Sequence, residues 1–497
     1  MIEFLLNNKI VRLADIDPNT TVLEYLRDQQ RVGTKEGCAS GDCGACTVVT
    51  AELDTQQQLS YKNINACITF IGAMHGKQLI TIEDLKSGNN LHSTQLAMVD
   101  TDGSQCGFCT PGFVMSLFSL QKHQKTYDRA TVQQSLAGNL CRCTGYKAID
   151  NAAQQALTCP ASDQFDAAKE QTKQSLKQIS SNSEACPSIG KNNNICHLPQ
   201  DAQSLADLLI QYPQCTLVAG STDLAIEVTQ NAKEFNHLIS TAYVSELKQT
   251  TITEQQISIG AAVTLNQCQH LLHQPFPDFA SLLERFASLQ VRNQGTLAGN
   301  IANASPIGDT PPALIALNAH MILRCANTQR SELVEDFVVD YRKTTLASSE
   351  FIEKIVIPIP QHDFHFKIYK VSKRLDDDIS AICVANYLCL DAAGKVSEIR
   401  LAYGGMAAIA KRAVQTEAAL LGKTWNEANI EAALLKLSDD FQPLSDFRAS
   451  NQYRMLCAQN LLRKFFYETP HSSEMTDNTH LATDIGGKMN MRISDYV

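Results

Sequence analysis

The chain lacks the features that would mark a membrane, secreted or nucleic-acid-binding protein. No apolar run approaches the length of about 18 residues that a membrane-spanning helix needs. Its start, MIEFLLNNKIVRL, has no basic cluster, long apolar stretch or small-residue cleavage site of a signal peptide. The 42 Lys and Arg residues are outnumbered by 52 Asp and Glu residues, and the net charge of −10 argues against nucleic acid as a partner. We expect a cytoplasmic protein with no membrane partner.

Two further absences narrow the choice of folds. The sequence has no G-x-G-x-x-G motif, so a Rossmann dinucleotide site is not expected, and we find no internal repeat. Its 17 cysteines come without a signal peptide, which argues against a disulfide scaffold and suits free thiols in a reducing compartment. At 497 residues the chain is too long for one hydrophobic core, and we expect three or four domains.

Eight of the cysteines form two compact sets within the first 143 residues. Written as spacings, the sets are C-x4-C-x2-C-x20-C and C-x2-C-x31-C-x-C. Each set supplies four thiolates, the number that one iron–sulfur cluster needs. The sequence therefore predicts two [2Fe–2S] clusters, the first held by Cys38, Cys43, Cys46 and Cys67 and the second by Cys106, Cys109, Cys141 and Cys143.

The first set lies in a loop with the spacing of a plant-type ferredoxin. Gly37, Gly41 and Gly44 alternate with the cysteines, and glycine lets backbone N–H groups point toward cluster sulfurs without a Cβ clash. An N-terminal hairpin and a capping box at Thr21–Glu24, which opens a helix over 22–31, predict an α+β surrounding. A zinc site or buried thiols are the alternatives, although zinc more often takes paired C-x2-C ligands.

The second set lies at the ends of predicted helices. Thr110-Pro111 is a helix start signal ahead of an apolar stripe over 112–123, and further helices are expected over 130–136 and 147–157. On the residues alone, the spacing of this set also fits a four-cysteine zinc site.

The residues around the second set resemble a known family. Cys106-Gly-Phe-Cys109-Thr-Pro-Gly and the run Gly138–Tyr146 are similar to the helical [2Fe–2S] domain of the xanthine dehydrogenase and molybdenum hydroxylase family. With two polar stretches interpreted as a linker and a tail, the resemblance implies an α+β multidomain fold. We expect a ferredoxin-like β-grasp [2Fe–2S] domain at 1–90, an all-helical [2Fe–2S] domain at 91–158, a linker at 159–195, an α+β FAD-binding domain (PCMH-like) at 196–364, a C-terminal α+β flavoprotein domain at 365–468 and a tail at 469–497.

A turn of small residues after a predicted strand suggests a flavin site. The run Leu217–Leu224 would present backbone N–H groups to phosphate, although an ordinary strand turn explains these residues equally well. This run and a second stretch, Thr296–Asp309, resemble the FAD domain of the same family. The resemblance implies FAD contacts at Thr216, Leu217, Val218, Ala219, Gly220, Ser221, Thr222, Asp223, Leu224, Phe286, Thr296, Gly299, Asn300, Asp309, Ile352 and Lys370.

The resemblance also implies a role. The chain is too short for the family's molybdopterin-binding portion, so we expect a large molybdopterin-binding subunit as partner, in an (αβ)2 heterotetramer. Electrons from the partner's molybdenum centre would pass through the second cluster, the first cluster and FAD to NAD⁺. The overall reaction would be oxidation of hypoxanthine and xanthine to urate, with no residue for purine hydroxylation on this chain.

Three other interpretations stay open at this point. The same architecture would serve an aldehyde or N-heterocycle hydroxylase, because substrate choice belongs to the partner. A self-contained NADH:acceptor reductase with FAD and [2Fe–2S] clusters would need a nicotinamide fingerprint, which the sequence lacks. A zinc scaffold would contain less iron and sulfide than one cluster per chain.

Overall fold

A computed structural model describes residues 1–158, 162–182 and 184–469, which divide into two compact units. Unit 1 comprises Met1–Lys248, Thr264–Asn266 and Ala287–Thr296. Unit 2 comprises Gln249–Val263, Gln267–Phe286 and the residues from Leu297 onward. Both units mix helices and strands, in agreement with the expected α+β multidomain class.

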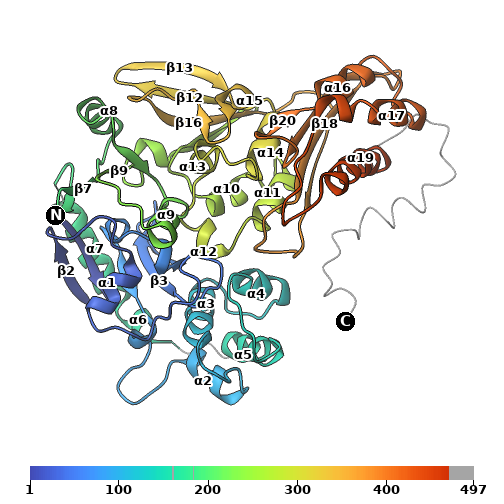
Figure 1. Ribbon diagram of the computed structural model, residues 1–497. Helices are drawn as coiled ribbons and strands as arrows, with labels where there is room; N and C mark the ends of the chain where they lie inside the picture. The colour runs from blue at the N-terminus through green and yellow to red at the C-terminus, as the bar shows by residue number, and fades with distance from the viewer. Residues whose placement is uncertain (159–161, 183, 470–497) are drawn as a thin grey trace. The chain divides into compact units, whose positions relative to one another are not determined.

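The first cysteine loop leads into the first sheet of unit 1, whose strand β3 (Figure 1) begins at Thr47, directly after Cys46. β1 and β2 form the expected hairpin about Asn7, which has a φ of 53°. α1 (Val22–Asp28) begins at the predicted capping box, where Thr21 Oγ1 accepts from the N–H of Glu24 and the Glu24 carboxylate accepts from the N–H of Thr21. The sheet has the order β2-β1-β5-β3-β4, with β1 (Ile2–Leu6), β2 (Lys9–Leu13), β3 (Thr47–Leu53), β4 (Leu59–Asn65) and β5 (Gln78–Ile80).

Four helices form the second part of unit 1. They are α2 (Ser93–Asp100), α3 (Thr110–His123), α4 (Arg129–Leu136) and α5 (Lys147–Thr158). The last three agree with the predicted helices to within two residues, and α2 lies within the stretch 91–158 that is expected to be all-helical. The predicted stripe of α3 is buried at Phe113, Leu117 and Leu120, in one core with Val49 and Ile80 of the first sheet. The helices and the sheet are therefore stabilised by shared apolar burial.

The segment interpreted as a linker, 159–195, contains regular structure. It holds α6 (Gln164–Ala167), α7 (Lys169–Asn182) and β6 (Ser188–Lys191). Leu176 and Ile179 of α7 are buried against Leu5, and Phe165 of α6 joins the core of the helical part. This corrects the expectation of a simple linker, because a few apolar side chains at helical spacing fix the segment despite its polar composition.

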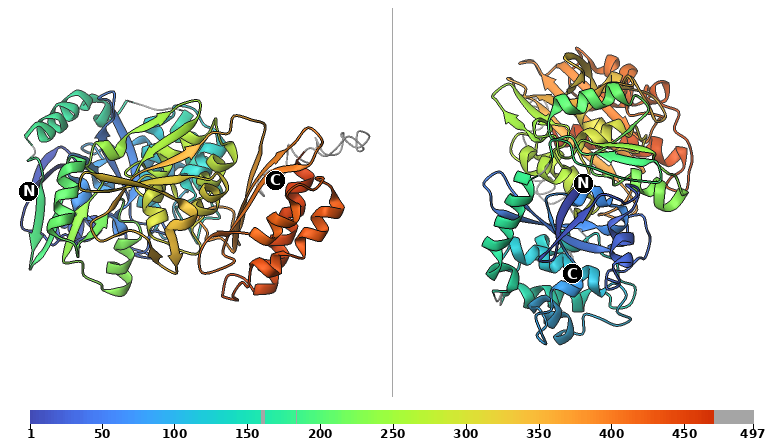
Figure 2. Two further views of the ribbon diagram at one scale, coloured as in Figure 1. Left: turned by 90° about the horizontal axis from the view of Figure 1, so that it is seen from above. Right: turned by 90° about the vertical axis from the view of Figure 1, so that its left-hand side faces the viewer.

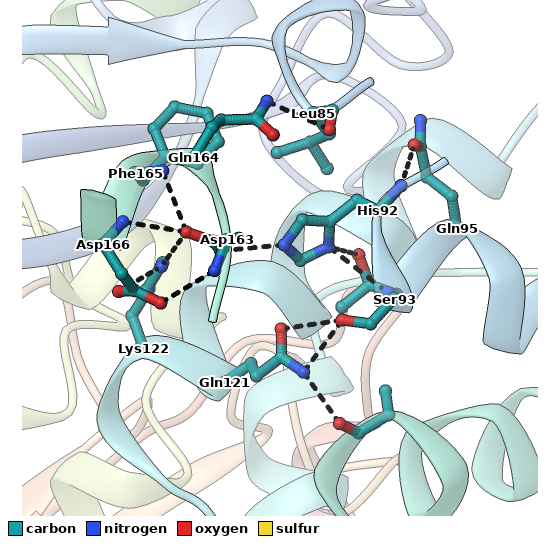
Figure 3. Close-up of polar contacts among 12 residues, drawn as sticks. Leu85, His92, Ser93, Gln95, Gln121, Lys122, Asp163, Gln164, Phe165 and Asp166 are labelled. Atoms are coloured by element: carbon teal, nitrogen blue, oxygen red, sulfur yellow. Dashed lines mark hydrogen bonds and ion pairs between the residues drawn. The ribbon is translucent and has the colours of Figure 1, made fainter. Parts of the chain in front are cut away.

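A buried polar network fixes the start of α6 (Figure 3). Asp163 Oδ1 accepts from the N–H groups of Phe165 and Asp166, both at 2.9 Å. Its carboxylate also contacts His92 Nε2 at 2.9 Å and Lys122 Nζ at 2.7 Å. Burial favours the protonated acid, but the hydrogen bonds from His92 and Lys122 outweigh it and hold the pKa of Asp163 well below its ordinary value.

The second sheet of unit 1 has the order β6-β7-β9-β8, in which β7, β9 and β8 run parallel. The loop after β8 therefore connects the carboxyl end of a parallel strand to the N-terminus of α9. This is the position expected of a turn that presents backbone N–H groups to phosphate. The remaining elements of unit 1 are β7 (Asn194–His197), α8 (Ala202–Gln211), β8 (Thr216–Val218), α9 (Leu224–Asn231), β9 (His237–Ser240) and α12 (Leu289–Arg292).

Unit 2 begins with an antiparallel sheet of order β10-β11-β16-β12-β13. Its strands are β10 (Thr250–Ile252), β11 (Gln256–Gly260), β12 (His320–Cys325), β13 (Thr328–Leu333) and β16 (Phe351–Pro358). In the sequence between these strands lie α10 (Leu265–Leu272), α11 (Pro277–Glu284), α13 (Leu297–Ala302), α14 (Thr310–Ala316), α15 (Val334–Phe337) and the short pair β14 (Val338–Asp340) and β15 (Lys343–Thr344).

The C-terminal part of unit 2 is a four-stranded antiparallel sheet with helices packed on one face (Figures 1 and 2). Alternate residues of β18, among them Val384 and Leu388, are buried against this helical layer together with Leu462 and Phe465 of α19. The elements are β17 (His365–Val371), β18 (Ile382–Leu390), β19 (Val396–Gly404), β20 (Lys411–Arg412), α16 (Val414–Leu420), α17 (Glu427–Leu434), α18 (Leu437–Asp440) and α19 (Asn451–Glu468).

Within the described ranges, no helix is both long and apolar enough to cross a membrane. The predicted tail at 469–497 lies outside the described residues except for Thr469. The other predicted domain boundaries stay predictions.

We predict that Asp163→Asn loosens α6 and α7 at neutral pH. Folding lowers the pKa of Asp163, so its stabilisation is present above the unfolded-state pKa of about 4 and is lost only as the pH falls below it. Removing the charge leaves His92 without its carboxylate and Lys122 paired with Asp166 alone, at a cost of about 1–3 kcal/mol. Amide exchange over 164–182 at pH 7 should accelerate roughly 5- to 150-fold. Asp166→Asn, which alters a more exposed carboxylate, is the control; equal exchange in both variants would contradict the prediction.

Candidate cofactor sites

The four cysteines of the first set bring their sulfur atoms together in unit 1. Cys46 Sγ lies 3.2 Å from Cys67 Sγ, and Cys38 Sγ is in hydrogen-bond contact with the sulfurs of Cys43 and Cys67. Cys46 and Cys67 are buried, whereas Cys38 and Cys43 are half-buried. The loop reaches this arrangement through Gly41 and Gly44, with φ of 84° and 67°, which side chains with a Cβ rarely adopt.

These four sulfurs fit a cationic group. The pKa of Cys43 and the pKa of Cys67 are both raised, mainly by hydrogen bonds to neighbouring sulfurs and to a lesser extent by burial. Four thiolates at such distances repel one another, so they ionise together only around a strong positive centre. A [2Fe–2S] core supplies that centre, with four cysteine thiolates as its ligands.

The second set makes a similar group nearer the surface. Sulfur contacts join Cys109 to Cys141 and Cys106 to Cys143. Burial, together with the neighbouring sulfur of Cys141, raises the pKa of Cys109 to about 12. Cys106 and Cys143 are exposed, while Cys141 is buried and its N–H donates to Tyr146 Oη at 3.0 Å. This set therefore has an open side.

The two cysteine loops touch through their backbones. The N–H of Leu140 donates to the carbonyl of Cys43 at 3.0 Å. Glycines permit this approach: a Cβ on Gly44 would lie 2.2 Å from the Gly138 carbonyl oxygen, and one on Gly112 would lie 2.2 Å from the Gly44 carbonyl oxygen. Only hydrogen fits at these positions, so the backbones of the two ligand loops approach each other directly.

Asn139 holds this contact in place, and sequence reasoning missed it. Its Nδ2 donates to the Gly44 carbonyl at 3.0 Å, and its Oδ1 accepts from Ser116 at 2.7 Å and from Gln290 Nε2 at 3.0 Å. Gln290 also contacts Thr47 Oγ1 at 3.2 Å. All these side chains are buried. Position 139 lies between the helical segments and close to Cys141, which is the one sequence signal that pointed toward it.

The predicted phosphate turn in unit 1 follows β8 and has the close packing that such a turn needs. A Cβ on Gly220 would lie 2.1 Å from the Gln294 carbonyl oxygen, so the turn packs directly on the segment that ends in Thr296. Ser221 takes a left-handed φ of 60°. Gln294 Nε2 is buried with no hydrogen-bond partner among the described residues. A buried donor beside a small-residue turn fits an anionic cofactor group, so FAD suits this turn.

The same turn contacts the first cysteine loop. Ser221 Oγ donates to the carbonyl of Ile68, the neighbour of Cys67, at 2.9 Å. At the end of α9, Thr229 Oγ1 donates to the Ala39 carbonyl at 2.7 Å and Gln230 Nε2 to the Cys38 carbonyl at 3.1 Å. Unit 1 thus joins the phosphate turn, the first cysteine loop and the second cysteine loop in that order.

The remaining predicted flavin residues lie in unit 2, apart from Thr296 in unit 1. Asp309 and Lys370 form a buried ion pair at 2.8 Å, and Ser380 Oγ donates to the other carboxylate oxygen at 2.5 Å. Asn300 Oδ1 accepts from Thr310 Oγ1 at 2.6 Å.

The other three predicted flavin residues of unit 2 lie on separate elements. Ile352 is buried in β16 opposite Leu323. Phe286 follows α11 and is half-buried, and Gly299 lies in α13. Contact of any of the sixteen residues with FAD stays a prediction.

Comparisons with known families cover most of the chain. Residues 5–72 match the 2Fe-2S iron-sulfur cluster binding domain, and residues 81–154 match the [2Fe-2S] binding domain. Residues 190–360 match the FAD binding domain in molybdopterin dehydrogenase, and residues 367–469 match the CO dehydrogenase flavoprotein C-terminal domain.

Individual relatives agree with the family matches. Xanthine dehydrogenase of Emericella nidulans is 32% identical over 496 residues, covering 88% of this chain and 36% of that protein. Xanthine dehydrogenase/oxidase of Gallus gallus is 30% identical, and the match covers 88% of this chain and 37% of that protein. A solved carbon monoxide dehydrogenase chain from Hydrogenophaga pseudoflava is 27% identical with a TM-score of 0.51, covering 54% of this chain and 94% of that one. The chain spans little more than a third of the length of these two curated relatives.

The fold and the matches define an iron–sulfur flavoprotein, with two 2Fe–2S domains, an FAD-binding domain and a flavoprotein C-terminal domain. The chain belongs to the molybdenum hydroxylase family and carries that family's iron–sulfur and FAD portion, which serves electron transfer.

If the two cysteine sets hold separate clusters, single ligand substitutions should remove them one at a time. We expect Cys43→Ser and Cys109→Ser each to abolish one of two distinguishable EPR signals of the reduced protein, because each removes a ligand from only one set. Cys457→Ser, outside both sets, should leave both signals intact. Persistence of both signals in either ligand variant would contradict the assignment.

Substitutions in the two flavin sets should weaken FAD retention. We expect Asp223→Ala in unit 1 and Asn300→Ala in unit 2 each to lower FAD affinity by roughly 5- to 150-fold, the loss of a hydrogen bond or charge contact. FAD per chain after gel filtration is the measurement. Asp207→Ala and Asn327→Ala, both at exposed positions, are the matched controls. Unchanged FAD content in both test variants would contradict the placement of the site.

Proposed function

We propose that this chain is the iron–sulfur and FAD subunit of an NAD-dependent xanthine dehydrogenase. The chain takes electrons from a large molybdopterin-binding partner subunit, in an (αβ)2 heterotetramer, and delivers them to NAD⁺. Hypoxanthine and xanthine are oxidised to urate on the partner. Support comes from the two named xanthine dehydrogenases that align with nearly nine-tenths of the chain.

The observation that carries the proposal is the order of contacts within unit 1. The first cysteine loop contacts the second loop through Cys43 and Leu140, and it contacts the phosphate turn through Ile68 and Ser221. The second set has the exposed cysteines, Cys106 and Cys143. This order favours entry of electrons at the second set from a partner and exit at the flavin turn.

The chain's own residues position and insulate this route. Cys38, Cys43, Cys46 and Cys67 would hold the first cluster, and the second set would hold the other. Iron–sulfur clusters exchange single electrons and a flavin exchanges one or two, which allows one-electron transfer to end in hydride transfer to NAD⁺. The buried amides of Asn139 and Gln290 hydrogen-bond to each other and hold the contact between the two loops. The scattered cysteines that the structure describes are all free, which suits a reducing cytoplasm.

The test is purification of the native protein from its source. We expect a large molybdenum-containing chain to co-purify and the complex to reduce NAD⁺ with hypoxanthine or xanthine. A complex that oxidises only aldehydes or N-heterocycles would contradict the purine substrate and would assign the chain to an aldehyde or N-heterocycle hydroxylase. Reduction of an acceptor by NADH with no molybdenum present would contradict the proposal and favour a self-contained reductase.

A further inference from the structure

A third group of side chains of the metal-ligating kind lies in the C-terminal part of unit 2, away from all eight cluster cysteines in sequence. His362 precedes β17, Cys389 lies near the end of β18, and Glu398 lies in β19. Antiparallel pairing places Cys389 directly opposite Glu398, and their side chains therefore share one face of the sheet. Three segments of chain thus bring an imidazole, a thiol and a carboxylate to one place.

The three donor atoms have the spacing of metal ligands. Cys389 Sγ lies 3.1 Å from His362 Nε2 and 3.9 Å from Glu398 Oε2, and the last two atoms lie 3.9 Å apart. In a tetrahedral zinc site, bonds of about 2.0–2.3 Å to nitrogen, oxygen and sulfur put the donors about 3.4–3.6 Å apart. The observed spacings differ from this by about half an ångström or less, which side-chain rotation accommodates.

Neighbouring residues contact all three donors. Arg400 pairs with Glu398 Oε1, which leaves Oε2 directed to Cys389. The Tyr387 ring stacks on Phe364 on one side, with ring centroids 5.6 Å apart, and lies under the Arg400 guanidinium at 4.0 Å. The Tyr387 hydroxyl then lies 3.2 Å from His362 Nε2 and 3.3 Å from Cys389 Sγ.

Hydrogen bonds alone do not account for the polar atoms gathered around His362 Nε2. His362 Nε2 has three polar neighbours within 3.9 Å, although one ring nitrogen can donate or accept only one hydrogen bond along its axis. Cys389 is 3% exposed, while the His362 and Glu398 side chains are 57% and 42% exposed. The site therefore has a buried soft ligand and an open side for entry of an ion and for a water ligand.

We propose that His362, Cys389 and Glu398 form a zinc site that ties the segment before β17 to the ends of β18 and β19. Nitrogen, thiolate and carboxylate donors together match zinc and disfavour magnesium and calcium, which prefer oxygen alone. The fourth position is open to water or to the Tyr387 hydroxyl. The site is independent of the proposed electron-transfer function.

The test uses the full chain with both clusters and FAD in place, so that the cluster cysteines are occupied. After dialysis against Zn²⁺ and desalting, metal analysis should find one zinc per chain. Cys389→Ser and His362→Ala should each lower this to near zero, whereas Mg²⁺ and Ca²⁺ should not be retained. Cys457→Ser and His365→Ala, in the same unit, are the matched controls and should keep one zinc. Because His362 is exposed, its substitution tests the site without disturbing the core.

X-ray absorption at the zinc edge identifies the ligands directly. We expect one sulfur at about 2.3 Å and the remaining ligands at about 2.0–2.2 Å as nitrogen or oxygen. Absence of bound zinc, equal zinc in all variants, or a shell with no sulfur would overturn the proposal. Two or more sulfurs would assign the zinc to cluster cysteines and would overturn it as well.

Discussion

The hydrogen bond from the N–H of Leu140 to the carbonyl of Cys43 is the contact on which unit 1 depends. It joins the ligand loops of both cysteine sets at 3.0 Å, and it exists only because Gly44, Gly112 and Gly138 carry no side chains. A Cβ on Gly44 or Gly112 would meet a backbone carbonyl oxygen at 2.2 Å, and one on Gly138 would meet the Cβ of Ser288 at 2.3 Å. Glycine loses more conformational entropy on folding than other residues do. At these positions it allows the ligand loops of the two clusters to lie close together.

The buried amides around this contact make it specific. Asn139 and Gln290 come from stretches that match different domain families, yet they hydrogen-bond at 3.0 Å in the interior of one unit. Buried amides without partners destabilise a protein by about 1–3 kcal/mol each. The network therefore forms only when the loop with Cys43, helix α3 and the segment 287–296 are all in place, and it couples the folding of the cluster domains to part of the flavin domain.

Features encoded in short runs of sequence were predictable. The cysteine spacings, the capping box at Thr21 and helices α3 to α5 depend on neighbours a few residues apart, and the structure contains the capping box and these helices. Asn139 and Gln290 have partners up to 243 residues away, which no local pattern indicates. The grouping of Cys389 with Glu398 depends on strand register. A shift of one strand by one residue would place the two side chains on opposite faces of the sheet. Helices α6 and α7 escaped prediction because their apolar residues are few.

The buried pair of Lys370 and Asp309 changes how two of the predicted flavin residues should be interpreted. Each is nearly inaccessible to solvent, and the carboxylate is already engaged by Lys370 and Ser380. Removing one partner of a buried pair leaves an uncompensated charge, at a cost of about 3–5 kcal/mol. Loss of FAD after substitution of Asp309 would therefore report stability as much as binding. Asp223, which makes no capping hydrogen bond to α9, separates the two effects more cleanly.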